Sequence, residues 1–306
     1  MGAARARRGT VAGAAVPPVA PGVVLFASVL AVSWAAPLIR LSDAPALAVS
    51  FWRLAFSLVL VSGMLTARGE WRVLRALRVR EWVVAAVAGV CLAGHFVAWI
   101  ASVGLTSVAA SVALVCTQPV WVALLGLVTL GERPGSRQWL GIALAVAGAA
   151  WIGWGDVGRA APAPLRGDLL ALLGAVLVAV YYVIGRGLRQ RIPIWPYVLA
   201  VYGCATVVLL GALLVSRVPL ASGYGTGDWL VFAALALGPM MVGHTGQNWA
   251  LRYLPAHTVN LSLLGEPVGA TLIAWLLPAI SEPPPTTALA GGALVLTGIV
   301  LGMRRR

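Results

Sequence analysis

The chain has 306 residues, of which 60% are hydrophobic and only 10% are charged, and its mean hydropathy is +0.93. Water-soluble domains carry about 25% charged residues. A soluble fold of this composition would have more apolar surface than one core can bury, and the rest would be exposed to water. The net charge of +13 comes from 22 arginines, with no lysine, in short gaps between apolar runs. That placement excludes a nucleic-acid-binding stripe and predicts a membrane protein in contact with lipid.

Ten apolar segments of membrane-spanning length follow one another along the chain. A transmembrane helix needs about 20 mostly apolar residues, and such long runs do not suit barrel strands. The first segment follows three arginines and resembles a signal peptide, but nine further runs favour a retained span. The expected helical spans are residues 20–39, 46–66, 82–102, 106–130, 138–155, 168–186, 195–216, 229–250, 256–277 and 286–303.

The connections between the spans are short, and one of them is strongly basic. Residues 68–80 place Trp71, Leu74 and Leu77 among five arginines. This segment fits either a short helix at an anionic membrane surface or a basic loop without fixed structure. The cysteines fall inside apolar runs without metal-ligand spacing, so we expect buried thiols, no disulfide and no metal. These cysteines are Cys91, Cys116 and Cys204.

The arginines also indicate how the chain is oriented. If both termini are cytoplasmic, 17 arginines lie in cytoplasmic segments and 4 in external ones, while Arg53 lies within a span. Cytoplasmic loops carry an excess of basic residues, and a missing or additional span would scramble this bias. The distribution therefore predicts ten spans with both termini in the cytoplasm.

The two halves of the sequence resemble each other. Gly94-His95 and Gly243-His244 are 149 residues apart, and Gln118-Pro119 and Glu266-Pro267 are 148 apart. Later in each half, Gly141 and Gly148 match Gly291 and Gly298. A five-helix unit has an odd number of spans, so two tandem copies have opposite orientations, as in many secondary transporters. We expect cytoplasmic tails at 1–19 and 304–306, five-helix repeats at 20–155 and 168–303, and an external linker at 156–167.

With these features the chain resembles the drug/metabolite transporter superfamily, specifically exporters with two tandem EamA domains. The resemblance covers about residues 20–303 and rests on the ten-span layout, the repeat and short local matches. These matches are Ser50-Phe51-Trp52-Arg53-Leu54, Glu266-Pro267 and the Gly-Glu-Arg-Pro turn at residues 131–134. It implies an exporter of amino acids, related metabolites or toxic compounds in the bacterial inner membrane, with a central cavity lined by polar positions of both repeats.

Glu266 is the acidic residue expected deep in the membrane, and its repeat mate is Gln118. A charged group at that depth costs roughly 2.5–3.5 kcal/mol, because removal from water disfavours the charged form. Glu266 fits either a substrate or proton site or a hydrogen-bonded acid that holds helices together. Pro267 lacks an N–H group, so we expect the Leu263 carbonyl to be free beside the carboxyl group.

Polar side chains also follow one face of the eighth span. His244, Gln247 and Asn248 have helical spacing and are unsuited to lipid, so they fit a cavity wall or contacts between helices. His95 and Trp99 form a weaker stripe in the third span. By span count, the two histidines are expected toward opposite membrane faces.

The remaining candidates are less sharply defined. Arg53 fits an anion-binding residue, an ion-pair partner of Glu266, or a cap on the carbonyl ends of nearby helices. Asn260 lies on a wide polar arc of the ninth span. For Tyr181 and Tyr182, we expect that one faces the cavity and the other faces lipid.

Together these features favour a secondary transporter of a small metabolite, amino acid or drug-like compound, working by alternating access as an exporter. Coupling to protons is one option, and no cofactor is expected. No Walker-type loop is present, so an ion or substrate gradient would drive transport. One alternative is a passive channel or a non-transporting scaffold. The other is an intramembrane enzyme, which the absence of a His-Glu-x-x-His motif disfavours. Nothing in the sequence assigns an oligomeric state.

Overall fold

The computed structural model describes residues 17–106, 108–154, 162–281 and 286–303. Within these ranges every regular element is a helix, and eight helical segments are long and apolar enough to cross a membrane. This confirms an all-helical protein with several membrane-spanning segments. The eight segments are Pro21–Arg40, Ala46–Ala67, Val79–Leu105, Ala110–Thr129, Pro164–Arg189, Ile194–Val215, Thr226–Ala250 and Ala256–Leu276.

The first half of the chain contains two interrupted segments. The break between α1 and α2 comes shortly before Pro37, which has no N–H group to donate. The break between α6 and α7 comes directly before Pro119. The helices are α1 (Pro21–Val32), α2 (Ala35–Arg40), α3 (Ala46–Ala67), α4 (Trp71–Arg75), α5 (Val79–Leu105), α6 (Val108–Val115), α7 (Gln118–Thr129) and α8 (Ser136–Trp154).

The second half has two further interruptions, both at a proline. A π-helical stretch, η1, surrounds Pro239, and a single 3-10 turn, η2, precedes Pro267. The elements are α9 (Pro164–Arg189), α10 (Ile194–Val215), α11 (Thr226–Leu235), η1 (Ala236–His244), α12 (Thr245–Ala250), α13 (Ala256–Ser262), η2 (Leu263–Gly265), α14 (Glu266–Leu276) and α15 (Thr286–Met303).

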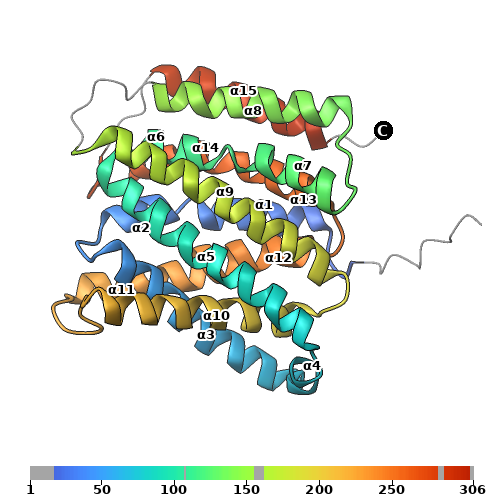
Figure 1. Ribbon diagram of the computed structural model, residues 1–306. Helices are drawn as coiled ribbons and strands as arrows, with labels where there is room; N and C mark the ends of the chain where they lie inside the picture. The colour runs from blue at the N-terminus through green and yellow to red at the C-terminus, as the bar shows by residue number, and fades with distance from the viewer. Residues whose placement is uncertain (1–16, 107, 155–161, 282–285, 304–306) are drawn as a thin grey trace, which may run out of the picture.

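Helices from the two halves pack against each other in pairs (Figure 1). The α8 and α15 pair lies at one side of the bundle, α3 and α10 lie at the other, and α5 packs along α9. Glycines bring α8 and α15 close together: a Cβ added at Gly148 would lie 2.6 Å from the Gly291 carbonyl, and one at Gly141 would lie 2.6 Å from the Gly298 carbonyl. Since Gly141 faces Gly298 and Gly148 faces Gly291, the two helices are antiparallel.

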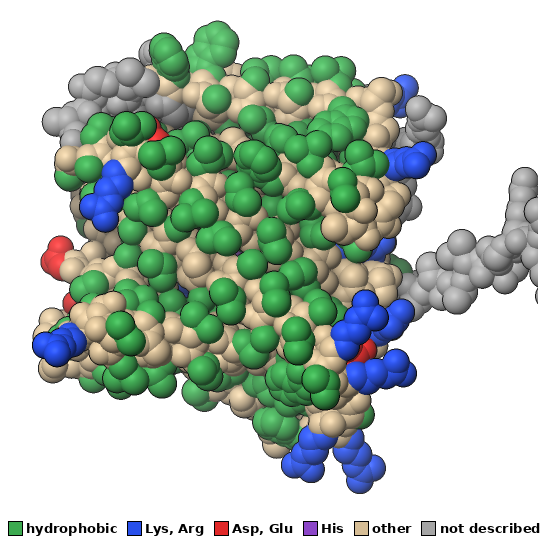
Figure 2. Space-filling model, viewed as in Figure 1, with side chains coloured by type: hydrophobic (Ala, Val, Ile, Leu, Met, Phe, Trp, Pro, Cys, Tyr) green, Lys and Arg blue, Asp and Glu red, His purple; other side chains and the backbone are tan. Residues whose placement is uncertain are grey.

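Most of the described arginines lie at one end of the bundle, which we call the arginine-rich end. It contains the α3–α5, α7–α8, α9–α10 and α12–α13 connections. Of the 15 described arginines, 11 lie there, 3 lie at the opposite end and Arg53 lies inside. Figure 2 shows arginines mainly at the right of the view, beside a broad hydrophobic surface. The 11 arginines are Arg68, Arg72, Arg75, Arg78, Arg80, Arg133, Arg137, Arg186, Arg189, Arg191 and Arg252.

Two expectations about local structure are resolved here. The basic segment between α3 and α5 is helical over Trp71–Arg75 and buries Leu74, so it is not an unstructured loop. Of the cysteines, Cys116 is buried, but Cys91 and Cys204 are partly exposed, which corrects the expectation that all three are buried. The expected tails at 1–19 and 304–306 and the linker at 156–167 lie largely outside the described residues.

Candidate functional site: a central cavity

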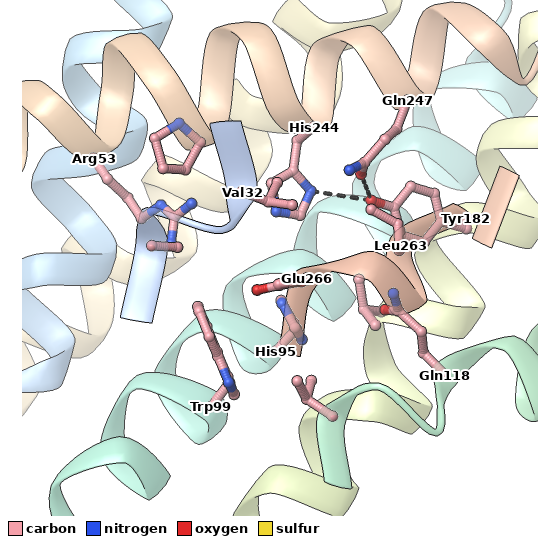
Figure 3. Close-up of a pocket in the computed structure, with 14 residues that line it drawn as sticks. Val32, Arg53, His95, Trp99, Gln118, Tyr182, His244, Gln247, Leu263 and Glu266 are labelled. Atoms are coloured by element: carbon pink, nitrogen blue, oxygen red, sulfur yellow. Dashed lines mark hydrogen bonds between the residues drawn. The ribbon is translucent and has the colours of Figure 1, made fainter. Parts of the chain in front are cut away.

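A small central cavity of about 30 Å³ lies where the interrupted helices meet α5 and α9 (Figure 3). A cavity of about 10–15 Å³ already holds one water molecule, so this one has room for water but not for a metabolite. In this structure the cavity is therefore smaller than a metabolite, and we call it the contracted cavity. Seven of the expected site residues line the cavity: Arg53, His95, Trp99, Gln118, His244, Gln247 and Glu266.

The two proline-associated breaks place matched residues at the cavity. Gln118 is the first residue of α7, and Glu266 is the first residue of α14. The amino-terminal ends of helices carry partial positive charge, which favours anionic groups nearby. The Leu263 carbonyl, expected to be free, instead accepts a hydrogen bond from the Glu266 N–H group. The 3-10 turn compensates for the N–H group that Pro267 lacks.

Arg53 is fully buried and only weakly paired. Its Nη2 lies 3.9 Å from the Met240 sulfur, and its Cζ lies 3.9 Å above the centre of the Phe96 ring. Its Nε and Nη1 have no hydrogen-bond partner among the described residues. It therefore does not cap carbonyl groups, as one interpretation of the sequence suggested. Since an unpaired buried charge is costly, these two N–H donors suit an anionic ligand.

Arg189 has the capping role that was considered for Arg53. Its Nε donates to the Asn248 carbonyl at 3.0 Å, and its Nη1 donates to the Ile192 carbonyl. It is almost completely buried although it lies in a segment expected to be a loop. Because the helix α9 extends to Arg189, its side chain points back into the bundle and ties α9 to α12.

The Glu266 carboxyl group faces the cavity from another wall than Arg53 (Figure 3). Its residue is only 9% exposed, and no hydrogen bond to the carboxyl group is present within the described residues. The ion pair with Arg53, one of the alternatives that the sequence left open, is also absent there, because no oxygen and nitrogen of the two residues lie within 4.0 Å. The site thus presents a cationic group and an acidic group that are separated by the cavity.

The two repeat-matched histidines lie together rather than toward opposite faces. The ring centres of His95 and His244 are 6.4 Å apart, and Phe96 contacts His244 at 5.3 Å between ring centres. The expectation was wrong because α5 continues to Leu105, 10 residues beyond His95. At 1.5 Å per residue, His95 is about 15 Å from that end, near the middle of the roughly 30 Å hydrocarbon core.

A hydrogen-bonded network joins α9 to the η1–α12 segment. The Tyr182 hydroxyl donates to the Gln247 Oε1 and lies 3.3 Å from the His244 Nδ1. Both Tyr181 and Tyr182 are buried, so neither faces lipid and that expectation is corrected. A buried tyrosine hydroxyl group normally has a hydrogen-bond partner. From the sequence, the polar face of the eighth span could therefore have been predicted to supply the partner of Tyr182.

Asn248 and Asn260 are buried but do not line the cavity. The Asn248 Nδ2 donates to the Tyr181 hydroxyl and to the His244 carbonyl at 2.6 Å. The Asn260 Nδ2 donates to the Ala256 carbonyl at 3.0 Å. Asn248 is turned toward α9, where the Tyr181 hydroxyl accepts its hydrogen bond. Asn248 therefore joins α12 to α9, whereas the hydrogen bond of Asn260 stays within α13.

A second polar cluster, which was not predicted from the sequence, lies at the arginine-rich end. The Glu132 carboxyl group accepts hydrogen bonds from the Arg186 Nε at 2.6 Å and from the Ala256 N–H at 2.9 Å. Arg186 also donates to the Leu251 carbonyl at 2.6 Å, and the His257 Nδ1 lies 3.8 Å from Glu132. This cluster, which we call the Glu132 clamp, joins the α7–α8 turn to α9 and to the α12–α13 connection.

Pro239 and several apolar residues complete the cavity wall. Pro239 lies in η1, where the wide π-helical turn surrounds the missing N–H group. Such stretches often occur at functional sites. Among the described residues no three His, Cys, Asp or Glu side chains are arranged to hold a metal ion. The chemistry of the cavity is thus that of buried charges and hydrogen-bonding groups.

Comparisons with known proteins agree on the family. The model of the EamA-like transporter family matches residues 20–154 and 165–304. A probable terminal-alkyne amino-acid exporter of Streptantibioticus cattleyicolor is 30% identical over 195 residues, which are 63% of each chain. The uncharacterized transporter YdfC of Bacillus subtilis is 28% identical over 204 residues, 65% of this chain and 64% of that one. The matches thus span less than two thirds of these curated relatives.

A solved crystal structure has the same fold. It superimposes with a TM-score of 0.75 at 20% sequence identity, over 92% of this chain and 96% of that one. At this level of identity the similarity supports the architecture alone. It is nevertheless extensive, since it includes nearly all of both chains.

Proposed function

Because the chain belongs to the EamA-like transporter family, we propose that it is a secondary transporter that exports a small metabolite through the central cavity by alternating access. In this proposal the conformation with the contracted cavity lies between states open to either side. The Glu132 clamp closes the arginine-rich end. Transport then requires the helices around α7, α9 and α13 to separate there.

The proposed topology has ten spans in two inverted five-helix units, residues 20–155 and 168–303. The eight long apolar segments supply most of these spans, and the shorter helices α8 and α15 supply the others. The antiparallel contact between the repeat-matched glycines of α8 and α15 supports the inversion. The excess of arginines at one end supports its placement in the cytoplasm, with both termini, in the inner membrane.

The proposed substrate is a zwitterion of amino-acid type. The observation that carries this proposal is the buried Arg53 side chain, whose Nε and Nη1 lack partners at a cavity that Glu266 also faces. Guanidinium N–H groups form strong, charge-assisted hydrogen bonds with carboxylates. Glu266 on the other wall suits an ammonium group, and the amino-acid exporter among the curated relatives points to the same class.

Glu266 is also the proposed proton-coupling group. A buried carboxyl group without a hydrogen-bond partner binds a proton when no cation is present and releases it to receive one. Gln118, its mate in the other repeat, provides an uncharged hydrogen-bonding group. The remaining proposed contacts come from His95, Trp99, His244 and Gln247, while Asn248 and Asn260 support the wall.

Counterflow in proteoliposomes tests the proposal. The experiment loads vesicles with an unlabelled amino acid and measures uptake of the labelled one, with and without a pH gradient. Saturable counterflow that fails when the carboxyl group is esterified is expected for a carrier that uses Arg53. Flux that does not saturate would indicate a pore, and chemical conversion of the compound without movement would indicate an enzyme.

A further inference from the structure

A surface groove of about 740 Å³ lies at the arginine-rich end, separate from the central cavity. The last turns of α9 form its floor, the start of α5 forms one wall and the end of α7 forms the other. From Val180 to Arg191 the floor covers 12 residues, and the 11 steps between them at 1.5 Å each give about 16 Å. This length is close to half of the roughly 30 Å hydrocarbon core, the depth of one leaflet.

The inner part of the groove is apolar and opens to the hydrophobic exterior. Its lining includes Val84 on α5, Leu125 on α7 and Ile184 on α9. Beside it, Val83 is 57% exposed and Val128 is 84% exposed, so the flanking surface faces lipid rather than protein. An acyl chain would therefore contact the groove along its length without crossing a polar barrier.

The outer part of the groove is cationic. Arg78, Arg80 and Arg191 line it, together with Glu81. The Glu81 carboxyl group already accepts a hydrogen bond from the Arg78 backbone N–H at 2.8 Å, where it caps α5. Three arginines and one glutamate leave two uncompensated positive charges, and none of the three guanidinium groups is in an ion pair within the described residues.

We propose that this groove binds one anionic phospholipid, with the phosphate between the three arginines and one acyl chain along α9. The charge at the mouth matches the headgroup, and the apolar floor matches the chain. Basic pockets between transmembrane helices at the cytoplasmic side commonly bind anionic headgroups. The bound lipid would bridge α5, α7 and α9, including the segment that carries Arg186 of the Glu132 clamp.

Native mass spectrometry of the full chain in detergent tests the proposal by titrating it with phosphatidylglycerol or phosphatidylcholine. The wild type is expected to retain one phosphatidylglycerol much more tightly than any phosphatidylcholine. An arginine near anionic lipid contributes a factor of roughly five to binding, so the R78Q/R80Q/R191Q variant should bind about a hundredfold more weakly. A matched control, R68Q/R72Q/R75Q, removes the same charge at the same end but outside the groove, and should bind like the wild type.

A second variant tests the apolar floor without changing charge. A Cβ at Gly187 meets only the Leu130 Cδ2, at 3.8 Å, so Gly187→Leu fills the groove without a backbone clash and should displace the lipid. Equal loss in the two arginine triple variants would overturn the proposal in favour of general attraction to the surface. So would equal retention of phosphatidylcholine, or full displacement by glycerol phosphate without acyl chains. None of these results depends on transport, so the proposed function is tested separately.

Discussion

At the scale of single residues, the two buried arginines differ in what surrounds their guanidinium groups. Arg189 donates to two backbone carbonyls, whereas Arg53 has a thioether and an aromatic ring as neighbours. A cation–π contact at a desolvated site stabilises the cation by about 2 kcal/mol. This is less than the cost of burying an unpaired charge. We therefore expect Arg53 to lower the stability of the empty protein and to be available to a ligand, and Arg189 to stabilise the fold.

Replacing each arginine by glutamine separates these roles. For Arg53→Gln we expect unchanged or higher thermal stability and a 10- to 150-fold weaker affinity for a carboxylate substrate, because hydrogen bonds to charged groups contribute about 1.5–3 kcal/mol. For Arg189→Gln we expect lower thermal stability. Thermal unfolding in detergent and the KM for counterflow measure the two effects. An unchanged KM in the folded Arg53→Gln variant would exclude Arg53 from the binding site.

Glu266→Gln tests the proposed acidic role with a side chain of nearly the same shape. The variant cannot exchange a proton or attract an ammonium group, so we expect transport to lose its response to a pH gradient while the protein stays folded. The measurement is counterflow with the external pH varied on one side. Gln118→Glu, which adds an acid at the matched position of the other repeat, is the companion variant. If transport by Glu266→Gln still responds to the pH gradient, Glu266 is not the proton-coupling group.

At the scale of helices, prolines set the breaks that bring the site together, and glycines set the contacts that hold the halves together. Gln118 and Glu266 each begin a half-helix because the next residue is a proline. Glycines at α8 and α15 allow the backbones to approach until a Cβ would overlap a carbonyl. In lipid, such close packing of small residues replaces the hydrophobic effect as the force between helices.

Gly148→Ala should therefore destabilise the protein although alanine favours helices. A Cβ there would lie 2.6 Å from the Gly291 carbonyl and 2.8 Å from the Val295 nitrogen, so the two helices must move apart. Gly63→Ala is the matched control, because its Cβ meets nothing within 4 Å, and it should stabilise α3 by roughly 0.5–1 kcal/mol. Thermal unfolding of both variants tests this pair. Equal stability of the two would contradict a close contact between α8 and α15.

Glu132→Gln tests the clamp at the arginine-rich end. It removes the negative charge that accepts hydrogen bonds from Arg186 and Ala256. The weaker hydrogen bonds should reduce the free energy that holds this end together by about 1–2 kcal/mol and favour opening there. The native cysteines are first replaced by alanine, and Val115, which lines the cavity, is replaced by cysteine. The measurement is the rate at which an impermeant maleimide labels this cysteine. We expect several-fold faster labelling from the arginine-rich side. Arg133→Gln, an exposed neighbour in the same turn, should leave the rate unchanged.

At the scale of the whole molecule, the two halves form one site between them. His95 and His244, at matched positions, contact each other across the centre, and Gln118 and Glu266 line the same cavity. A pseudo-two-fold axis in the membrane plane brings matched residues together only where they lie close to it. Under the proposed inverted topology the cavity would lie near that axis, where a change in packing of one half against the other would alter access.

The proposed orientation predicts where reporters are active. A phosphatase that folds only outside the cytoplasm should be active when inserted at Gly223, in the α10–α11 connection, and inactive at Gly131 or after Arg306. Fluorescent fusions at the same positions should show the opposite pattern. Activity at Gly131 would reverse the proposed topology, although the fold would be unaffected.

Much of the fold was predicted from the sequence, because hydrocarbon imposes local rules. A span must be about 20 apolar residues long and helical, so the expected 46–66 and 195–216 lie within a residue of Ala46–Ala67 and Ile194–Val215. The polar residues were recognisable for the same reason, since any ionisable group in such a span is conspicuous. Which of them face each other depends on helix crossing and depth, which follow no local rule.

The sequence by itself determined an all-helical membrane protein with an internal repeat and seven of the residues at its central cavity, because burial in lipid restricts composition residue by residue. Only the tertiary structure decided that the two histidines meet, that Arg53 and Glu266 stay apart, and that Arg189 rather than Arg53 caps carbonyl groups. These outcomes depend on the relative position of helices far apart in the chain, which packing sets and no single segment encodes.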